Sequence, residues 1–267
     1  MLTSEHFFTL SSFAHASLFH AANYAWEALK GLRPYLIDQH YPALSKKIIL
    51  NEPLLTTIVL FEDEIFPANG KGIRVIVGDA TKGKLEVFRD DEPLAGASVI
   101  MAGAVLCGEK IHLGKGILVE SGAFIRGPVS IGDQSEVRQG AYLRGDCLIG
   151  NRCVVGHVTE VKNSILLDDA KAGHFAYLGD SIIGNRVNLG AGTKLANLKF
   201  QPGTIWIRTP EGPLDTGMRK LGAILGDDVQ TGCNSVTNPG ALVARRSMVM
   251  PNTTVSSGYH KEDSIIR

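Results

Sequence analysis

The sequence predicts an all-β fold: a parallel β-helix made of hexapeptide repeats, preceded by a small α+β segment that caps it. The first observation is an aliphatic residue at every sixth position through the centre of the chain. The second is the return of this period near the C-terminus, after a stretch rich in proline and glycine. Neither an α-helix nor a flat strand repeats every six residues, whereas each flat side of a β-helix coil does.

The period is unbroken in the centre of the chain. Its aliphatic positions are Leu113, Val119, Ile125, Ile131, Val137, Leu143, Ile149, Val155 and Val161, and Met101 and Cys107 fit it upstream. The phase then shifts by one residue at Leu166 and again at Ile183, and the last phase resumes from Leu225 to Val255. At about eighteen residues per coil, the repeat predicts about eight coils.

Three segments follow from this pattern. Residues 96–260 form the β-helix domain, and residues 198–223, which carry Pro202, Gly203 and Pro210, form a loop extruded from one corner. Residues 1–95 form the cap, which would cover the unpaired strand edges at one end of the β-helix. In this cap we expect a helix over Phe13–Tyr35, closed by Gly31 and Pro34, and a hairpin over 73–77 and 85–88. We expect it to be structural and to contribute no catalytic group.

The composition narrows the class of protein. The 27 acidic and 27 basic residues balance, which argues against a nucleic-acid or membrane-surface protein. The sequence shows neither a signal peptide nor an eighteen-residue apolar run, so a cytoplasmic location is predicted. All four cysteines lie inside the repeat without a C-x-x-C motif, and Cys147 and Cys153 are interpreted as buried structural thiols.

Two motifs are more specific than the period. They are Lys171-Ala-Gly-His-Phe-Ala-Tyr-Leu-Gly-Asp180 and Asn188-Leu-Gly-Ala-Gly-Thr193, and the runs 196–200 and 219–223 add to them. Over roughly Met101 to Val255 the chain resembles the left-handed β-helix acyltransferase domain of the bifunctional enzymes that make UDP-N-acetylglucosamine. It resembles still more the archaeal sugar-1-phosphate nucleotidylyltransferases that carry such a domain. The left hand is implied by this resemblance, because the usual crossover rule would favour the opposite hand.

The resemblance implies a reaction in a homotrimer: transfer of an acyl group, which we expect to be acetyl, from acyl-CoA to the amine of an amino-sugar 1-phosphate. Acetyl-CoA is then a co-substrate and no metal is expected. His174 matches the general base. The positions that hold the sugar phosphate match Arg144 and Lys162, and those around the amino sugar match Tyr177, Asn188 and Asn197. The positions that bind acyl-CoA match Ala191, Gly192 and Cys233. In the trimer we expect the extruded loop to reach the neighbouring subunit through Trp206 or Ile205.

The chain departs from the family pattern in three places. Cys233 stands where relatives often have serine, and a lysine that relatives place after the asparagine has no counterpart among residues 201–203. No upstream nucleotidylyltransferase domain is visible either, because Gly31 is the only glycine before Gly70 and such a domain needs a glycine-rich phosphate loop. We therefore expect that this chain does not make the nucleotide sugar by itself.

Other interpretations stay open. His174 could be a solvent-facing residue, Arg144 could belong to a solvated ladder with Arg126 and Arg138, and the asparagines could form turns. A metal-dependent carbonic anhydrase of similar fold would need three histidines around zinc, whereas His112, His157 and His174 are isolated in the sequence. A catalytically silent β-helix that binds a sugar phosphate or acts as a scaffold is the second alternative.

Overall fold

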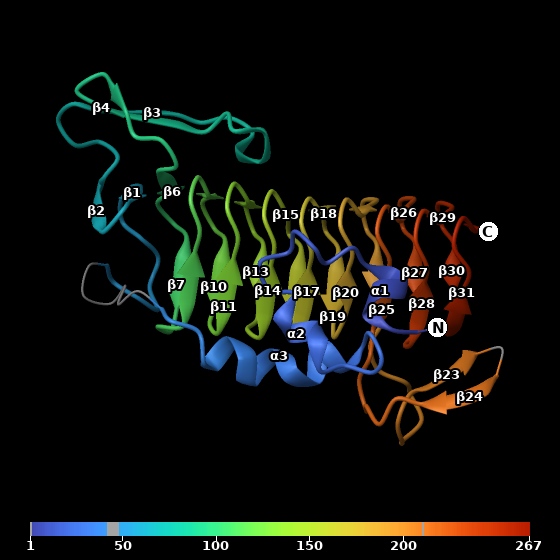
Figure 1. The fold of residues 1–267 in the computed structure, drawn as a ribbon. Coiled ribbons are helices and arrows are strands. Elements are labelled where there is room, and N and C mark those ends of the chain that lie inside the picture. The colour runs from blue at the N-terminus through green and yellow to red at the C-terminus, as the bar shows by residue number, and fades with distance from the viewer. Residues whose placement is uncertain (1, 42–47, 210) are drawn as a thin grey trace.

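The computed structural model describes residues 2–41, 48–209 and 211–267, so residue 1 and residues 42–47 of the predicted cap, and Pro210 of the predicted loop, lie outside the described part. The chain winds into a left-handed parallel β-helix with three flat sheets (Figure 1). Two of these sheets have eight strands each, in agreement with the predicted number of coils.

Each sheet is named here after one central strand. The β18 sheet contains β6 (Ser98–Ile100), β9 (Leu118–Val119), β12 (Glu136–Val137), β15 (Val154–His157), β18 (Lys171–His174), β21 (Asn188–Leu189), β26 (Gln230–Thr231), β29 (Met248–Val249) and β32 (Ile265–Ile266). The β19 sheet contains β7 (Val105–Cys107), β10 (Phe124–Arg126), β13 (Tyr142–Leu143), β16 (Glu160–Lys162), β19 (Tyr177–Gly179), β22 (Lys194–Leu195), β27 (Val236–Thr237) and β30 (Thr254–Val255). The β20 sheet contains β8 (Ile111–Leu113), β11 (Val129–Ile131), β14 (Cys147–Ile149), β17 (Ser164–Leu166), β20 (Ile182–Ile183), β25 (Ala223–Leu225), β28 (Ala241–Val243) and β31 (Gly258–His260).

The aliphatic residues of the period fill the interior of the β-helix. Ile125, Val137 and Ile149 are fully or almost fully buried, and their counterparts stack in register in neighbouring coils. Cys147 and Cys153 are buried as predicted, and burial raises the pKa of the Cys147 thiol to about 12, which keeps it protonated and inert.

The shifts of phase all lie at one corner, between the β19 and β20 sheets. The inward pair Leu106 and Leu113 is one residue further apart than the period, whereas the pairs Val161–Leu166 and Leu178–Ile183 are one residue closer. Our extension of the period to Met101 and Cys107 was wrong by one residue, because Ile100 and Leu106 are the fully buried positions. This corner absorbs changes of length without disturbing the stack.

The N-terminal segment does more than cap one end. β1 (Ile58–Phe61) pairs antiparallel with β2 (Glu64–Pro67) and with β6, so it covers the first edge of the β18 sheet. The helices α1 (Ser4–Phe7), α2 (Ser17–His20) and α3 (Glu27–Ile37) instead lie along the outer face of the β20 sheet (Figure 1). There, Leu32 and Leu36 pack in one apolar cluster with Leu148 and Ile165.

The single predicted helix over Phe13–Tyr35 is divided in the structure. α2 ends at His20, and α3 runs through Gly31 and Pro34, which we expected to close the helix. Leu32 and Leu36 are buried against the β20 sheet, and this burial outweighs the poor helix propensity of the glycine and the proline. Trp26, which precedes α3, is buried and stacks on Tyr24.

The predicted hairpin is confirmed and forms an arm beside the β18 sheet. We use "arm" for β3 (Ile73–Ile76), β4 (Glu86–Arg89) and the tip that joins them, residues 77–85, which includes the short helix η2 (Ala80–Lys82); β5 (Glu92–Pro93) pairs with β4. Figure 1 shows the arm running along the coils from the N-terminal end. Its tip is docked, because the Ala80 N–H donates a 2.8 Å hydrogen bond to the buried carboxylate of Glu136.

The loop at 198–223 leaves the stack between β22 and β25, as predicted. It contains the hairpin of β23 (Trp206–Thr209) and β24 (Gly212–Asp215). Ile205 and Ile207 are fully buried in the cluster on the β20 sheet of the same chain, so the expectation that Ile205 packs on a neighbouring subunit was wrong. Trp206 and Phe200 are exposed. None of the described helices is long and apolar enough to cross a membrane.

Candidate functional site

The predicted site residues divide between two corners of the β-helix. The β18–β19 corner holds His174, Ala191, Gly192 and Cys233, with Asn188 on the adjoining strand β21. Arg144, Lys162 and Asn197 lie toward the β19–β20 corner, and Tyr177 begins the strand between the two corners. Within one chain, the flat β19 sheet separates the general base predicted at His174 from the cations predicted to bind phosphate.

A buried carboxylate organises the β19–β20 corner. Asp180 is 4 % exposed and accepts hydrogen bonds from Lys162 Nζ at 3.0 Å, from Asn163 Nδ2 at 2.7 Å and from Asn197 Nδ2. Tyr177 and Asn197 both approach Gly179, where a Cβ atom would lie too close to either side chain. The structure therefore brings Lys162, Asn197 and Tyr177 together, but the lysine and the asparagine already have a partner in Asp180.

Arg144 is also paired. Its guanidinium donates a 2.6 Å hydrogen bond to Glu160 Oε1, in the next coil, and its side chain is 42 % exposed. Arg126 and Arg144 lie on the same side of the β19 sheet, as the ladder interpretation expected, but Arg138 follows β12 on the β18 sheet and binds Glu136. A phosphate at Arg144 would have to share the guanidinium with Glu160 or displace it.

His174 ends strand β18 and is exposed. Its ring stacks on that of His157 in the preceding coil, with 5.7 Å between the ring centroids and an angle of 24° between the planes. His157 Nδ1 lies 4.0 Å from Glu120 Oε2. The two coils approach closely here because Gly156 has no Cβ, and a Cβ would collide with the backbone of Gly173. The His174 ring also lies 6.1 Å from the ring of Phe175, and the exposed remainder of the imidazole is open to a ligand.

A pocket of about 350 Å³ surrounds His174. From the β-helix, Asn188, Ala191 and Cys233 line it together with His174, as the sequence led us to expect. Gly192 turns the corner with a φ of 76°, and its N–H donates to the carbonyl of His174 at 3.1 Å. The N–H of Ala191 makes no hydrogen bond with a residue in the described ranges, so it is the backbone donor available to a ligand.

Sequence reasoning missed the rest of this pocket. Lys171 and Arg138 line it, and so do Asp79 and Thr81 from the tip of the arm. Lys171 lies inside the motif that carried the resemblance, three residues before His174. Because side chains alternate along a strand and Ala172 points inward, the sequence could have placed Lys171 on the outer face. No local signal could have placed Asp79 there, because it lies far from β18 in the sequence. The N-terminal segment is therefore part of the pocket wall.

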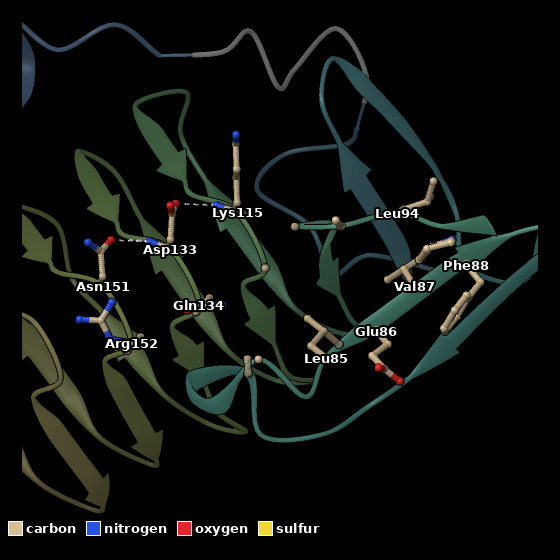
Figure 2. A pocket seen from close by; sticks show the side chains of 16 residues that line it. Leu85, Glu86, Val87, Phe88, Leu94, Lys115, Asp133, Gln134, Asn151 and Arg152 are labelled. Carbon is tan, nitrogen blue, oxygen red and sulfur yellow. Dashed lines mark hydrogen bonds between the residues drawn. The ribbon is translucent and has the colours of Figure 1, made fainter. Parts of the chain in front are cut away.

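A larger cavity, of about 550 Å³, lies between the arm and the corner joining the β20 and β18 sheets (Figure 2). Leu85, Val87 and Leu94 line it from the arm side. On the coils, the Asp133 carboxylate accepts the Lys115 N–H and the Asn151 side chain accepts the Asp133 N–H, both at 2.8 Å. These bonds join successive coils, so the polar groups shown with dashed lines in Figure 2 serve the corner itself.

No cluster of metal ligands occurs in the described part of the chain, where we find no group of three or more His, Cys, Asp or Glu side chains that could hold an ion. His112 lies on β8, in a different sheet from His157 and His174, and contacts Ser130 Oγ at 3.3 Å.

The family model for the GMPPB C-terminal domain matches residues 125–266. Among curated proteins, a "bifunctional sugar-1-phosphate nucleotidylyltransferase/acetyltransferase" from Sulfurisphaera tokodaii is 36% identical over 102 residues, which cover 38% of this chain and 25% of that relative. This chain thus spans about a quarter of the length of such bifunctional relatives.

An "uncharacterized acetyltransferase YaiX" from Escherichia coli O6:K15:H31 is 27% identical over 246 residues, covering 88% of this chain and 98% of the relative. A solved Francisella novicida UDP-N-acetylglucosamine acyltransferase covers 60% of this chain and 65% of its own, at 14% identity and a TM-score of 0.34.

Proposed function

Because the chain belongs to the family of the GMPPB C-terminal domain, we propose that it transfers an acyl group from acyl-CoA to the amine of an amino-sugar 1-phosphate. Acetyl-CoA is the donor we favour, since two relatives have acetyltransferase in their names, one matching 38% of this chain and the other 88%. The observation that carries the proposal is the pocket that gathers His174, Asn188, Ala191 and Cys233, four residues selected from the sequence for this reaction.

The chemistry assigns a role to each group. The amine nitrogen attacks the thioester carbon, a C–N bond forms, the C–S bond breaks, and CoA leaves as the thiol. His174, with its imidazole neutral, takes the proton that the amine loses and passes it to the departing sulfur, which restores the base. The free N–H of Ala191 is a donor for the charge that develops on the thioester oxygen. Cys233 forms no covalent intermediate in this scheme, because the amine attacks the donor directly.

We also propose that the site is completed in a homotrimer. Within one chain, the β19 sheet separates His174 from Lys162 and Arg144, so a sugar phosphate bound by these cations would have to be presented by a neighbouring subunit. Exposed apolar side chains on the extruded loop, Leu198, Phe200 and Trp206, offer a surface for such contact. Light scattering at micromolar concentration should give three times the mass of the chain, and a monomer would contradict the shared site.

A thiol-release assay tests the reaction. Purified protein is incubated with acetyl-CoA and a panel of amino-sugar phosphates that includes glucosamine 1-phosphate and galactosamine 1-phosphate. Glucose 1-phosphate, which lacks the amine, is the matched control and should release no thiol above background. Binding of an amino-sugar phosphate without any thiol release would favour the silent sugar-phosphate-binding protein instead.

A further inference from the structure

The wall of the His174 pocket nearest the arm carries charges that the proposed reaction has not used. Lys171 lines the pocket from β18, Arg138 lines it from the end of β12, and Asp79 and Thr81 line it from the tip of the arm. We propose that Lys171 binds a phosphoryl group of a substrate in this pocket, with the arm tip as the facing wall. The inference rests on the proposed function for the identity of the substrates, but the binding site stands on its own geometry.

Lys171 differs from the predicted phosphate-binding cations in having no partner of its own. Its ammonium makes no ion pair or hydrogen bond with a residue in the described ranges, whereas Arg144 is paired with Glu160 and Lys162 with Asp180. Its side chain is partly buried beside the pocket. An ammonium that is partly removed from water and has no carboxylate bound to it is well placed to bind an anion.

The floor beside Lys171 leaves room for a ligand. Gly173 follows two residues later on the same outer face of β18, and a Cβ built there would meet nothing within 4 Å. Asn188 is the register partner of Lys171 on β21 and lines the same pocket, so its amide is a second donor next to the ammonium. Arg138 adds positive charge, but its guanidinium is bound to Glu136 at 2.7 Å.

The arm tip is held firmly enough to act as a wall. Besides the hydrogen bond from Ala80 to Glu136, Ala80 is buried in a cluster with Val87 and Leu118. Asp79 on this tip is ionised, because hydrogen bonds from Lys82 and Thr81 lower the pKa of its carboxyl to about 2. The charge of Lys171 also lowers this pKa, so the carboxylate and the ammonium lie within electrostatic range of each other.

This arrangement gives the two residues opposite effects on an anionic ligand. Lys171 attracts a phosphoryl group, and the carboxylate of Asp79 repels it. A phosphoryl group in the pocket could come from the CoA donor or from the sugar phosphate, and both sources share the chemistry that Lys171 recognises. Lys171 would instead repel a cationic ligand in the same place, and Asp79 would attract it.

Calorimetric titration separates these cases. Coenzyme A and glucosamine 1-phosphate are titrated into the full chain and into Lys171→Met, Lys171→Arg and Asp79→Asn, with the exposed Lys71→Met, outside the pocket, as the matched control. Lys171→Met should weaken binding of at least one probe by about tenfold or more, as expected for the loss of a charged hydrogen bond, and Lys171→Arg should restore part of it. Asp79→Asn should tighten binding of that same probe, and Lys71→Met should leave it unchanged.

The probe that responds identifies the source of the phosphoryl group. The inference would be overturned if wild-type protein bound neither probe, if Lys171→Met bound both as wild type does, or if Asp79→Asn weakened binding while hydrogen exchange showed residues 79–82 still docked. Failure of the proposed function has a different signature: probe binding that depends on Lys171 would persist, but no acceptor would release thiol from acetyl-CoA.

Discussion

The two corners that hold the predicted site residues differ in how their polar groups are satisfied. At the β19–β20 corner, Asp180 is bound by Lys162, Asn163 and Asn197, and Arg144 is bound by Glu160. At the β18–β19 corner, His174 is exposed and its ring contacts those of His157 and Phe175. The same family motifs supply both corners, yet one corner has its charges paired and the other has groups free for a ligand.

The comparison separates residues that hold the fold from residues that can act. A buried carboxylate with several donors stabilises the chain only while every partner is present, so substitutions there should lower the free energy of unfolding. Exposed groups around a pocket contribute little to stability, so substitutions there should lower binding or turnover alone. Three measurements on stability test this difference, and they are ordered by the size of the expected effect.

The largest loss of stability should follow Asp180→Ala. The change leaves the ammonium of Lys162 and the amides of Asn163 and Asn197 without their acceptor, so we expect the free energy of unfolding to fall by about 3 kcal/mol or more. Urea unfolding measures it. The matched control is Asp169→Asn, which breaks an exposed pair with Arg152 and should cost less than about 1 kcal/mol. Equal effects of the two changes would show that the corner is not organised by Asp180.

A smaller loss should follow Glu136→Ala. The Ala80 N–H and the Arg138 guanidinium would both lose their acceptor, which should destabilise the docked tip by about 1–3 kcal/mol. Hydrogen exchange of residues 77–85 should speed up more than that of the β-helix core. Glu86→Gln, an exposed position on the same arm, should change neither quantity. If exchange at the tip stayed slow in Glu136→Ala, another contact would have to hold the arm.

The smallest effect should be a pH dependence of the contact between the helices and the β20 sheet. Burial lowers the pKa of His15 and of His112 below the ordinary 6.5, so folding favours their neutral forms. As the pH falls below 6.5, the unfolded chain binds protons at these histidines before the folded chain does. Their contribution to the free energy of unfolding is therefore complete above pH 6.5 and is lost as the pH falls toward the lower pKa values of the folded state. Urea midpoints should therefore fall between pH 7.5 and 5.5 by less in the double variant His15→Gln, His112→Gln. An identical fall in wild type and variant would assign the pH dependence to other groups.

Much of the fold could be predicted because the repeat is a local property of the sequence. The aliphatic positions from Leu113 to Val161, the position of the extruded loop and the hairpin of the arm were all visible in the chain. The continuation of α3 through Gly31 and Pro34 was not, since it depends on how Leu32 and Leu36 pack on a sheet that is distant in sequence. Met101 and Cys107 were assigned one residue out of phase because one corner is longer by a residue.

The candidate site was predictable to the extent that it lies in the motifs. Sequence reasoning found His174, Asn188, Ala191 and Cys233, which the structure gathers in one pocket. It could not foresee that Lys162 and Arg144 are paired with acidic residues from neighbouring coils, because such pairs depend on register. It also missed Asp79, which lines the pocket wall from the N-terminal segment.

The most direct test of the account compares turnover and stability in His174→Ala. With acetyl-CoA and the acceptor found in the thiol-release screen, the change should lower kcat by about 10²–10⁴-fold, the usual contribution of a positioned base. The urea midpoint should stay at the wild-type value, because the His174 ring is exposed. Nearly full turnover in His174→Ala would contradict both the base and the assignment of this corner as the reactive one.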